Sequence, residues 1–268
     1  MSLRQRFPTA MILLAILFVV VQYAPPIVIL LALQALILAA LLEFYGLVSK
    51  AGLKPRVAVG IVFTGLLAVS AYVPSFPLSA AIFIGILLTA FVYVVAVNRA
   101  ELLSSFPASI AVTLMGPVYI AFTLDHLYLL RIERGPFPVY LLCGAVFLGD
   151  SGAMLFGTLF GRHKMTPVAS PNKTWEGSFG GLLFAAAGAL VVKLLLLPEI
   201  GFARAILAGV LAHAFAQVSD PLESLFKRAA GVKDASSILP GHGGFLDRVD
   251  SLLLASPFFY YFIRIFWK

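Results

Sequence analysis

The sequence predicts an all-α, polytopic integral membrane protein with about nine transmembrane helices. Of its 268 residues, 61% are hydrophobic and 12% are charged, whereas soluble domains are roughly half apolar and about a quarter charged. The apolar residues form long runs of the length that a helix needs to cross a bilayer. A membrane β-barrel shows short strands of alternating hydrophobicity instead, so the long runs favour helices.

Polar residues, prolines and glycines divide the apolar runs into separate spans. Pro25 and Pro26 separate the first two spans, and Pro74 and Pro77 lie between the third and the fourth. The expected spans cover residues 8–23, 27–48, 57–73, 78–97, 106–124, 137–156, 178–197, 202–218 and 245–266. We expect an N-terminal membrane region, residues 1–135, with about five of the spans and a role in packing. A C-terminal catalytic region, residues 136–268, would hold about four of the spans and two cytoplasmic polar loops.

The net charge of +7 indicates the orientation in the membrane rather than binding of nucleic acid. Most of the 19 lysines and arginines fall on the side of the N-terminus, which the positive-inside rule assigns to the cytoplasm. Basic residues there also attract anionic lipid headgroups. Arg4 and Arg6 precede the first span, which we expect to remain as an uncleaved helix of a multi-pass protein in the cell membrane. Both long polar segments, residues 157–177 and 219–244, then face the cytoplasm.

The polar segment of residues 219–250 concentrates the residue types that bind phosphates and divalent cations. Carboxylates hold hard cations such as Mg²⁺, and lysines, arginines and backbone N–H groups hold phosphate oxygens. Gly243 and Gly244 allow the backbone to approach a ligand closely. We interpret the segment as the catalytic part of a membrane enzyme that works on phosphates. Its charged residues are Asp220, Glu223, Lys227, Arg228, Lys233, Asp234, Asp247, Arg248 and Asp250.

Structural roles are open alternatives for several of these residues. Asp220, Pro221 and Glu223 have the pattern of a helix start, with Asp220 as the N-cap. Asp247 and Asp250 share one helix face, which is costly in a membrane unless a cation or an ion-pair partner such as Lys227, Arg228 or Arg248 lies there. His242 suits either a turn or a phosphate contact.

A second polar segment follows the span of residues 137–156. Asp150 lies at membrane depth in an apolar run and is therefore a functional candidate. Asn172, Lys173 and Thr174 offer polar contacts and a cation to a phosphate, although Thr174 also suits a helix cap. We expect His213, in the eighth span, to be a packed core histidine rather than a residue that lines the active site.

The remaining charged residues indicate structural features rather than a functional site. We expect Glu43, inside the second span, to pair with Lys50 or to extend its carboxylate to the interface. We also expect a solvated loop, formed by Asp125, His126, Arg131, Glu133 and Arg134.

The polar segments resemble those of the phosphatidate cytidylyltransferases, also called CDP-diacylglycerol synthases. The family signature is matched without a gap by Ser224, Lys227-Arg228, Lys233-Asp234, Pro240 to Gly244, Asp247-Arg248 and Asp250. Upstream, Asp150-Ser-Gly-Ala and the stretch from Ser170 to Gly177 are similar to family elements. Ser219 and Met154 stand where the family often has Gly and Tyr, whereas the N-terminal half matches only in hydropathy.

The resemblance implies that CTP and phosphatidic acid react to give CDP-diacylglycerol and pyrophosphate, with Mg²⁺, in a homodimer within membrane lipids. The N-terminal membrane region, residues 1–135, would then also serve dimerisation. A second cation is an open alternative. The implied catalytic residues are Asp220, Lys227, Arg228 and Asp247. The implied metal ligands are Asp220 and Asp247, with Asp250 or Asp150 as further candidates. The implied substrate contacts are Asn172, Lys173, Thr174, Ser224, Lys233, His242, Gly243, Gly244 and Arg248.

Two other functions remain as alternatives. A CTP-dependent lipid-alcohol kinase would transfer the γ-phosphoryl group and release CDP. A non-enzymatic cation or lipid transporter would use the buried carboxylates, but it has no need of a Lys-Arg pair and a Gly-rich loop between them.

Overall fold

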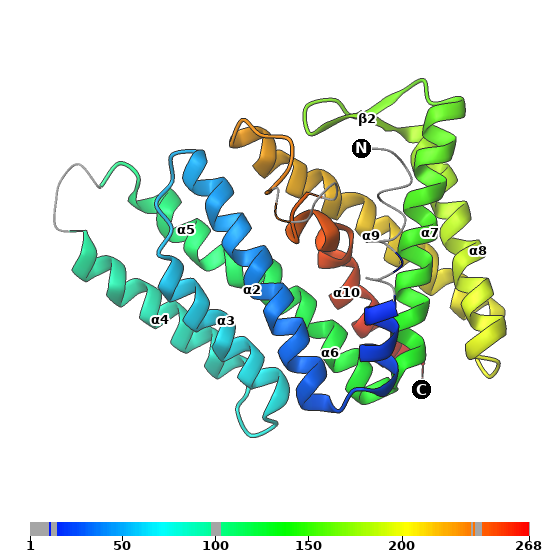
Figure 1. Ribbon diagram of the computed structural model, residues 1–268, viewed down its shortest axis with the longest axis horizontal. Helices are drawn as coiled ribbons and strands as arrows, with labels where there is room; N and C mark the ends of the chain where they lie inside the picture. Colours follow the sequence, from blue (N-terminus) through cyan, green and yellow to red (C-terminus); the bar gives the residue numbers. More distant parts are fainter. Residues whose placement is uncertain (1–10, 12–14, 98–102, 237, 239–242, 268) are drawn as a thin grey trace. The chain divides into compact units, whose positions relative to one another are not determined.

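The computed structural model describes residues 11, 15–97, 103–236, 238 and 243–267, which form helices connected by short loops (Figure 1). In chain order the elements are α2 (Pro26–Lys50), α3 (Val57–Tyr72), α4 (Leu78–Ala96), α5 (Phe106–Gly116), the π-helical segment η2 (Pro117–Phe122), α6 (Thr123–Arg134), α7 (Pro136–Phe160), β1 (Lys164–Thr166), β2 (Ser170–Thr174), α8 (Trp175–Leu196), α9 (Phe202–Ala229) and α10 (Leu246–Phe266). The prediction of an all-α protein is confirmed, with the β1–β2 hairpin as a small addition between α7 and α8.

Seven helices among the described residues are long and apolar enough to cross a membrane. They are α2, α4, the stretch of α5, η2 and α6, and the helices α7, α8, α9 and α10. Helix α3 is apolar but has 16 residues, fewer than the roughly 20 that a bilayer core requires. Residues 15–23 are helical, whereas most of the predicted first span, with Arg4 and Arg6 before it, lies outside the described residues. The polytopic membrane character is therefore confirmed, and the count of nine is not.

Prolines and capping residues determine where several helices begin. Pro26 begins α2 and Pro136 begins α7, positions at which the missing N–H of proline costs no helical hydrogen bond. Gly135 has a φ of 80° and separates α6 from α7. Helix α8 begins after Thr174, whose hydroxyl oxygen accepts a hydrogen bond from the N–H of Gly177 at 3.1 Å.

The helix that begins at Phe106 continues to Arg134, so the prediction of a solvated loop around Asp125 is wrong. Asp125 and His126 are only 4% and 3% exposed. Gln34 of α2 donates a hydrogen bond to Asp125 Oδ1 at 2.7 Å. A buried carboxylate requires such a partner, and the hydrophobic pattern around Asp125 does not reveal one that is 91 residues away.

Helix α9 runs through Pro221, so the alternative that Asp220 caps a new helix is wrong. An interior proline removes one backbone hydrogen bond and costs about 3 kcal/mol in an ordinary helix. In membrane helices neighbouring groups satisfy the freed carbonyl, and such prolines are tolerated. Because the helix is continuous, Ser224 and Lys227 lie about one and two turns after Asp220 along one face.

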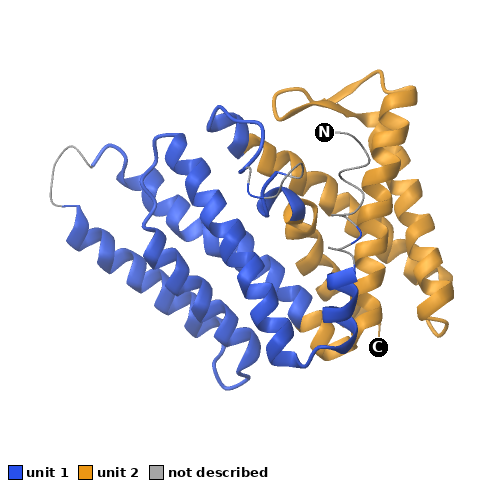
Figure 2. Cartoon of the chain, viewed as in Figure 1, with its two compact units in different colours: residues 1–128, 226–248 blue, residues 129–225, 249–268 orange. Residues whose placement is uncertain are grey.

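The chain forms two compact units, residues 1–128 with 226–248 and residues 129–225 with 249–268 (Figure 2). In the first unit, large rings pack against glycines. A Cβ atom on Gly60 would collide with the ring of Tyr45, and one on Gly85 with the ring of Phe63. The hydroxyl of Tyr45 donates to the carbonyl oxygen of Thr113 at 2.8 Å, which satisfies its polar end.

In the second unit, glycines bring α7 and α8 close together. A Cβ atom on Gly177 would lie 2.7 Å from the carbonyl oxygen of Ala153. A Cβ atom on Gly188 would lie 2.6 Å from the carbonyl oxygen of Gly144. Small residues at such contacts are typical of helices that associate in membranes, where close packing replaces the hydrophobic effect. This pair of helices supports the β1–β2 hairpin that carries Lys173.

Candidate active site

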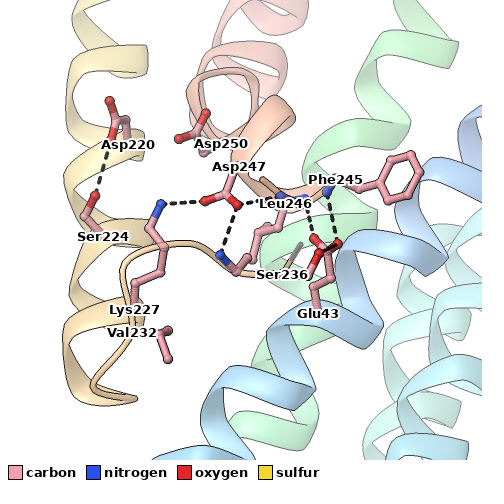
Figure 3. A network of polar contacts seen from close by, with 12 residues as sticks. Glu43, Asp220, Ser224, Lys227, Val232, Ser236, Phe245, Leu246, Asp247 and Asp250 are labelled. Atoms are coloured by element: carbon pink, nitrogen blue, oxygen red, sulfur yellow. Dashed lines mark hydrogen bonds and ion pairs between the residues drawn. The ribbon is translucent and has the colours of Figure 1, made fainter. Parts of the chain in front are cut away.

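Lys227 and Asp247 form a buried ion pair between α9 and the first turn of α10 (Figure 3). Lys227 Nζ lies 2.7 Å from Asp247 Oδ1, and the two side chains are 10% and 9% exposed. This pair is one of the alternatives that the sequence left open for Asp247. Removing either residue would leave the charge of the other buried without its ion-pair partner.

The second carboxylate oxygen of Asp247 closes the loop between α9 and α10. Oδ2 accepts hydrogen bonds from the backbone N–H groups of Ala235, at 3.0 Å, and Gly244, at 2.8 Å. Ala235 lies on the limb that leaves α9, and Gly244 lies on the limb that enters α10. One carboxylate therefore connects Lys227 with both limbs of the loop.

Two glycines of the loop allow the chain's own carboxylates to come close. Gly243 has a φ of 78°, a conformation that favours glycine, and a Cβ atom there would lie 2.8 Å from Asp247 Oδ2. A Cβ atom on Gly244 would collide with the carboxylate of Glu43. Contacts of Gly243 and Gly244 with a substrate stay predictions, and His242 lies outside the described residues.

Glu43 belongs to this cluster, and the sequence reasoning missed its role. Its side chain on α2 is 7% exposed, which excludes the expected extension to the interface, and it accepts hydrogen bonds from Ser236, Phe245 and Leu246. One sequence feature could have identified Glu43: a carboxylate within a membrane helix is a functional candidate.

Lys173, Asp220 and Ser224 come together in the second unit. Lys173 Nζ lies 2.6 Å from Asp220 Oδ2, and these side chains are 27% and 31% exposed. The hydroxyl of Ser224 donates to the other oxygen of Asp220 at 3.4 Å. The structure thus brings together three residues that the resemblance assigns to phosphates, metal and substrate.

Asp150 and Asp250 share the hydroxyl group of Ser251, a residue that the sequence did not indicate. Ser251 Oγ lies 3.1 Å from Asp150 Oδ2 and 3.4 Å from Asp250 Oδ1. The backbone N–H of Ser251 also donates to Asp250 Oδ1 at 2.7 Å. A hydroxyl has one hydrogen and satisfies one acceptor at a time. The shared hydroxyl places two carboxylates near each other, an arrangement that favours a cation beside them.

His213 lies near this pair but is packed like a core residue. It is fully buried, and Nδ1 is 3.9 Å from Asp150 Oδ1. Neither ring nitrogen has a hydrogen-bond partner among the described residues. A Cβ atom on Gly181 would lie 2.6 Å from Nε2, so this glycine gives the imidazole its space.

The antiparallel β1–β2 hairpin carries Asn172, Lys173 and Thr174. Glu176, at the start of α8, accepts hydrogen bonds from the backbone N–H groups of Arg162, at 3.1 Å, and His163, at 3.2 Å. This carboxylate ties the two residues before β1 to the start of α8. Thr174 caps α8, as one sequence alternative predicted, and Asn172 is exposed.

Three further cations of the predicted site, Arg228, Lys233 and Arg248, are exposed. Arg228 Nη1 donates to the carbonyl oxygen of Val232 at 3.2 Å, which places it beside the turn after α9. Phosphate binding by these cations stays a prediction.

The donor atoms fit a hard cation such as Mg²⁺, because they are carboxylate and hydroxyl oxygens. No group of three or more His, Cys, Asp or Glu side chains converges on one point in the described part of the chain. The protein would therefore supply one or two carboxylates, and water and substrate phosphates the remaining ligands, as is common for Mg²⁺. Asp220 and Asp247 belong to different units, so their sharing of one cation stays a prediction.

A model of the cytidylyltransferase family matches residues 4–266. The chain belongs to this family. Similar curated relatives are a phosphatidate cytidylyltransferase of Staphylococcus epidermidis, 40% identical over 147 residues, and one of Haemophilus influenzae, 44% identical over 121 residues. The alignments cover 55% and 44% of this chain and 56% and 42% of the relatives. The uncharacterized protein YnbB of Escherichia coli is 36% identical over 167 residues, 60% of this chain and 56% of the relative.

Membership of the cytidylyltransferase family confirms the resemblance seen in the polar segments. The family match also includes the N-terminal half, which the sequence alone related to the family only by hydropathy. The chain spans about half the length of the curated relatives it matches.

Proposed function

We propose that the chain transfers the cytidylyl group of CTP to phosphatidic acid and releases pyrophosphate, with CDP-diacylglycerol as the lipid product. The observation that carries the proposal is the pairing of opposite charges at both polar segments. Each lysine expected to bind phosphate, Lys173 or Lys227, contacts a carboxylate expected to bind a cation, Asp220 or Asp247. A magnesium nucleotide presents both charges, so it can replace each partner without leaving a charge unpaired.

The residues support a reaction in which the substrate supplies the nucleophile. An oxygen of the lipid phosphate attacks the α-phosphorus of CTP and forms the new bond. The bond from the α-phosphorus to the oxygen shared with the β-phosphate breaks, and its electron pair leaves with pyrophosphate. Lys173 and Lys227 reduce the repulsion between the two polyanions and stabilise the charge on the leaving group by fixed electrostatics. Asp220 and Asp247 are the residues that would hold Mg²⁺, which would polarise phosphoryl oxygens and orient the nucleotide.

The family and the composition support the proposed substrates and the proposed location. Curated relatives carry the name phosphatidate cytidylyltransferase, which supports CTP and phosphatidic acid as substrates. The apolar helices support a location in the cell membrane. We propose that both polar segments face the cytoplasm, where CTP is available, in accordance with the distribution of lysine and arginine. A homodimer is proposed from the resemblance alone.

The test uses purified protein with phosphatidic acid, Mg²⁺ and CTP labelled at either the α- or the γ-phosphate. We expect the α label to enter the lipid and the γ label to appear in pyrophosphate. A parallel reaction contains a diacylglycerol or another lipid alcohol in place of phosphatidic acid. Transfer of the γ label into that lipid would identify a lipid kinase. Failure of both labels to enter lipid would contradict an enzymatic role and leave the transporter alternative.

A further inference from the structure

We infer that Glu43 is a positioning residue for the proposed reaction: it fixes the loop between α9 and α10 and thereby the start of the helix that carries Asp247. This inference rests on the proposed function as far as turnover is concerned. The structural part, that one carboxylate of α2 holds the loop, is testable without any activity.

The carboxylate of Glu43 accepts three hydrogen bonds, one from the limb that leaves α9 and two from the start of α10 (Figure 3). Oε1 accepts from the hydroxyl of Ser236 at 2.6 Å and from the backbone N–H of Phe245 at 3.1 Å. Oε2 accepts from the backbone N–H of Leu246 at 2.8 Å. The first N–H groups of a helix lack partners within the helix, so Glu43 supplies acceptors that α10 itself does not have.

Glu43 and Asp247 hold neighbouring residues on both limbs of the loop. Asp247 binds the N–H groups of Ala235 and Gly244, whereas Glu43 binds Ser236 and the two residues after Gly244. The hydroxyl of Ser236 also accepts from the N–H of Ile238 at 3.3 Å, which extends the anchoring by two residues. If the Glu43 contacts are lost, the two limbs depend more on the Asp247 carboxylate, which is also the group proposed to bind the cation.

Position 43 favours a charged oxygen acceptor, because the three hydrogen-bond partners of Glu43 all donate to it. Hydrogen bonds to an ionised acceptor are roughly twice as strong as neutral ones, and the N-terminus of a helix favours negative charge. Glutamine at position 43 would place an amide N–H₂ group where one carboxylate oxygen accepts a hydrogen bond. At least one buried donor would then face another donor.

Gly244 gives independent support for this role. A Cβ atom there would collide with Glu43 Oε2, and Gly244 is not among the described residues with a positive φ. The backbone conformation therefore tolerates alanine, and the lack of a side chain serves the approach of the Glu43 carboxylate. This accounts for the second glycine of the pair without a substrate contact.

The N-terminal half of the chain then also supports the start of α10. Helix α2 lies in the region that the sequence assigned to packing and dimerisation, and yet its Glu43 supports the start of α10. Substitutions in α2 that move Glu43 are then expected to lower turnover without any contact with a substrate.

The first experiment compares Glu43→Gln and Glu43→Ala with Asp125→Asn, in the full chain. Asp125 is a matched control, because it is a carboxylate of the same unit with a similar burial, 4% exposed against 7%, and its hydrogen bond goes to Gln34. We expect kcat to fall by about tenfold in Glu43→Gln and further in Glu43→Ala, with a smaller change in the KM for CTP. Amide hydrogen exchange should accelerate at residues 245 and 246 in both Glu43 variants but not in Asp125→Asn.

Each outcome decides one claim. If the wild-type protein shows no transfer, the proposed function fails, and the exchange rates at residues 245 and 246 still test the anchoring. If Glu43→Gln and Asp125→Asn lose stability and turnover in the same proportion, Glu43 is only a structural residue. Unchanged exchange at residues 245 and 246 in Glu43→Ala would overturn the inference directly.

The second experiment is a double-mutant cycle between positions 43 and 244. Gly244→Ala should lower kcat by about tenfold or more in the wild-type background, because the new methyl group displaces the carboxylate. In the Glu43→Ala background the same change should have little further effect, since the colliding oxygen is gone. Additive effects would instead assign Gly244 to a contact other than Glu43.

Discussion

Asp220→Asn removes the charge of one proposed metal ligand while its shape is preserved. Asp220 lies inside α9, where its carboxylate contacts Lys173 Nζ at 2.6 Å and the hydroxyl of Ser224 at 3.4 Å. Asparagine can still accept the hydrogen bond of Ser224, so the local structure should survive. The variant therefore separates the role of the charge from the role of the side chain in the helix.

The expected loss of stability is small. The Lys173 and Asp220 side chains are 27% and 31% exposed, and ion pairs with such access to solvent contribute about 0–1 kcal/mol. No helix cap is lost, because α9 continues through Asp220. The expected loss of turnover is large: if the carboxylate binds the magnesium nucleotide, a hundredfold fall corresponds to about 2.7 kcal/mol of transition-state stabilisation.

The assay follows turnover against Mg²⁺ concentration and thermal unfolding in the same detergent. Glu133→Gln is the control, because it removes one carboxylate charge from an exposed position of α6 in the same unit. Its turnover should stay within about twofold of the wild type, as for most surface substitutions. Near-normal turnover of Asp220→Asn at every Mg²⁺ concentration would refute the metal role and leave Asp220 as a partner of Lys173 and Ser224 only.

The remaining predictions concern the two ion pairs, a helix cap, a helix contact and the orientation. Lys227→Met should lower the free energy of unfolding by about 3–5 kcal/mol and Lys173→Met by about 1 kcal/mol or less, because only the first pair is buried; equal losses in denaturation would contradict this. Thr174→Ala should cost about 1 kcal/mol of stability and Thr174→Ser little, whereas weaker CTP binding at full stability would assign Thr174 to the substrate. Gly181→Ala should cost about 1–3 kcal/mol through its contact with His213, and an unchanged melting temperature would show that α8 moves away freely. In a Cys143→Ser background, Lys164→Cys and Lys233→Cys should both react with a reagent added from the cytoplasmic side, and labelling from opposite sides would disprove the proposed orientation.

The helices could be predicted largely from the sequence because apolar runs of membrane length have few alternatives. The expected spans 57–73, 78–97 and 245–266 correspond to Val57–Tyr72, Leu78–Ala96 and Leu246–Phe266. The end of the eighth span could not be predicted. Asp-Pro has the same local conformational preference at a helix start and inside a continued membrane helix, and contacts with other helices decide between them. Polar residues after residue 124 indicated a loop for a similar reason, since Gln34 is remote in sequence.

The candidate site was predictable where its residues lie in short motifs. The signature residues Lys227 and Asp247 are 20 positions apart, and the sequence named their ion pair as an alternative. Glu43 and Ser251 were missed. Glu43 is 202 positions from Phe245 and lies in an apolar run with no motif around it. Ser251 adjoins Asp250, but its second partner, Asp150, is 101 positions away. Local patterns cannot identify partners that only the packing of helices brings together.

The most direct measurement of the proposed chemistry follows heavy oxygen from the lipid phosphate into the products. Phosphatidic acid carrying the isotope at its non-bridging phosphate oxygens is incubated with CTP, Mg²⁺ and the protein, and both products are analysed by mass spectrometry. Direct attack of the lipid phosphate predicts that CDP-diacylglycerol retains all of the label and that pyrophosphate contains none. Loss of one labelled oxygen from the lipid, or its appearance in a released phosphate, would contradict the proposal that the lipid phosphate is the nucleophile.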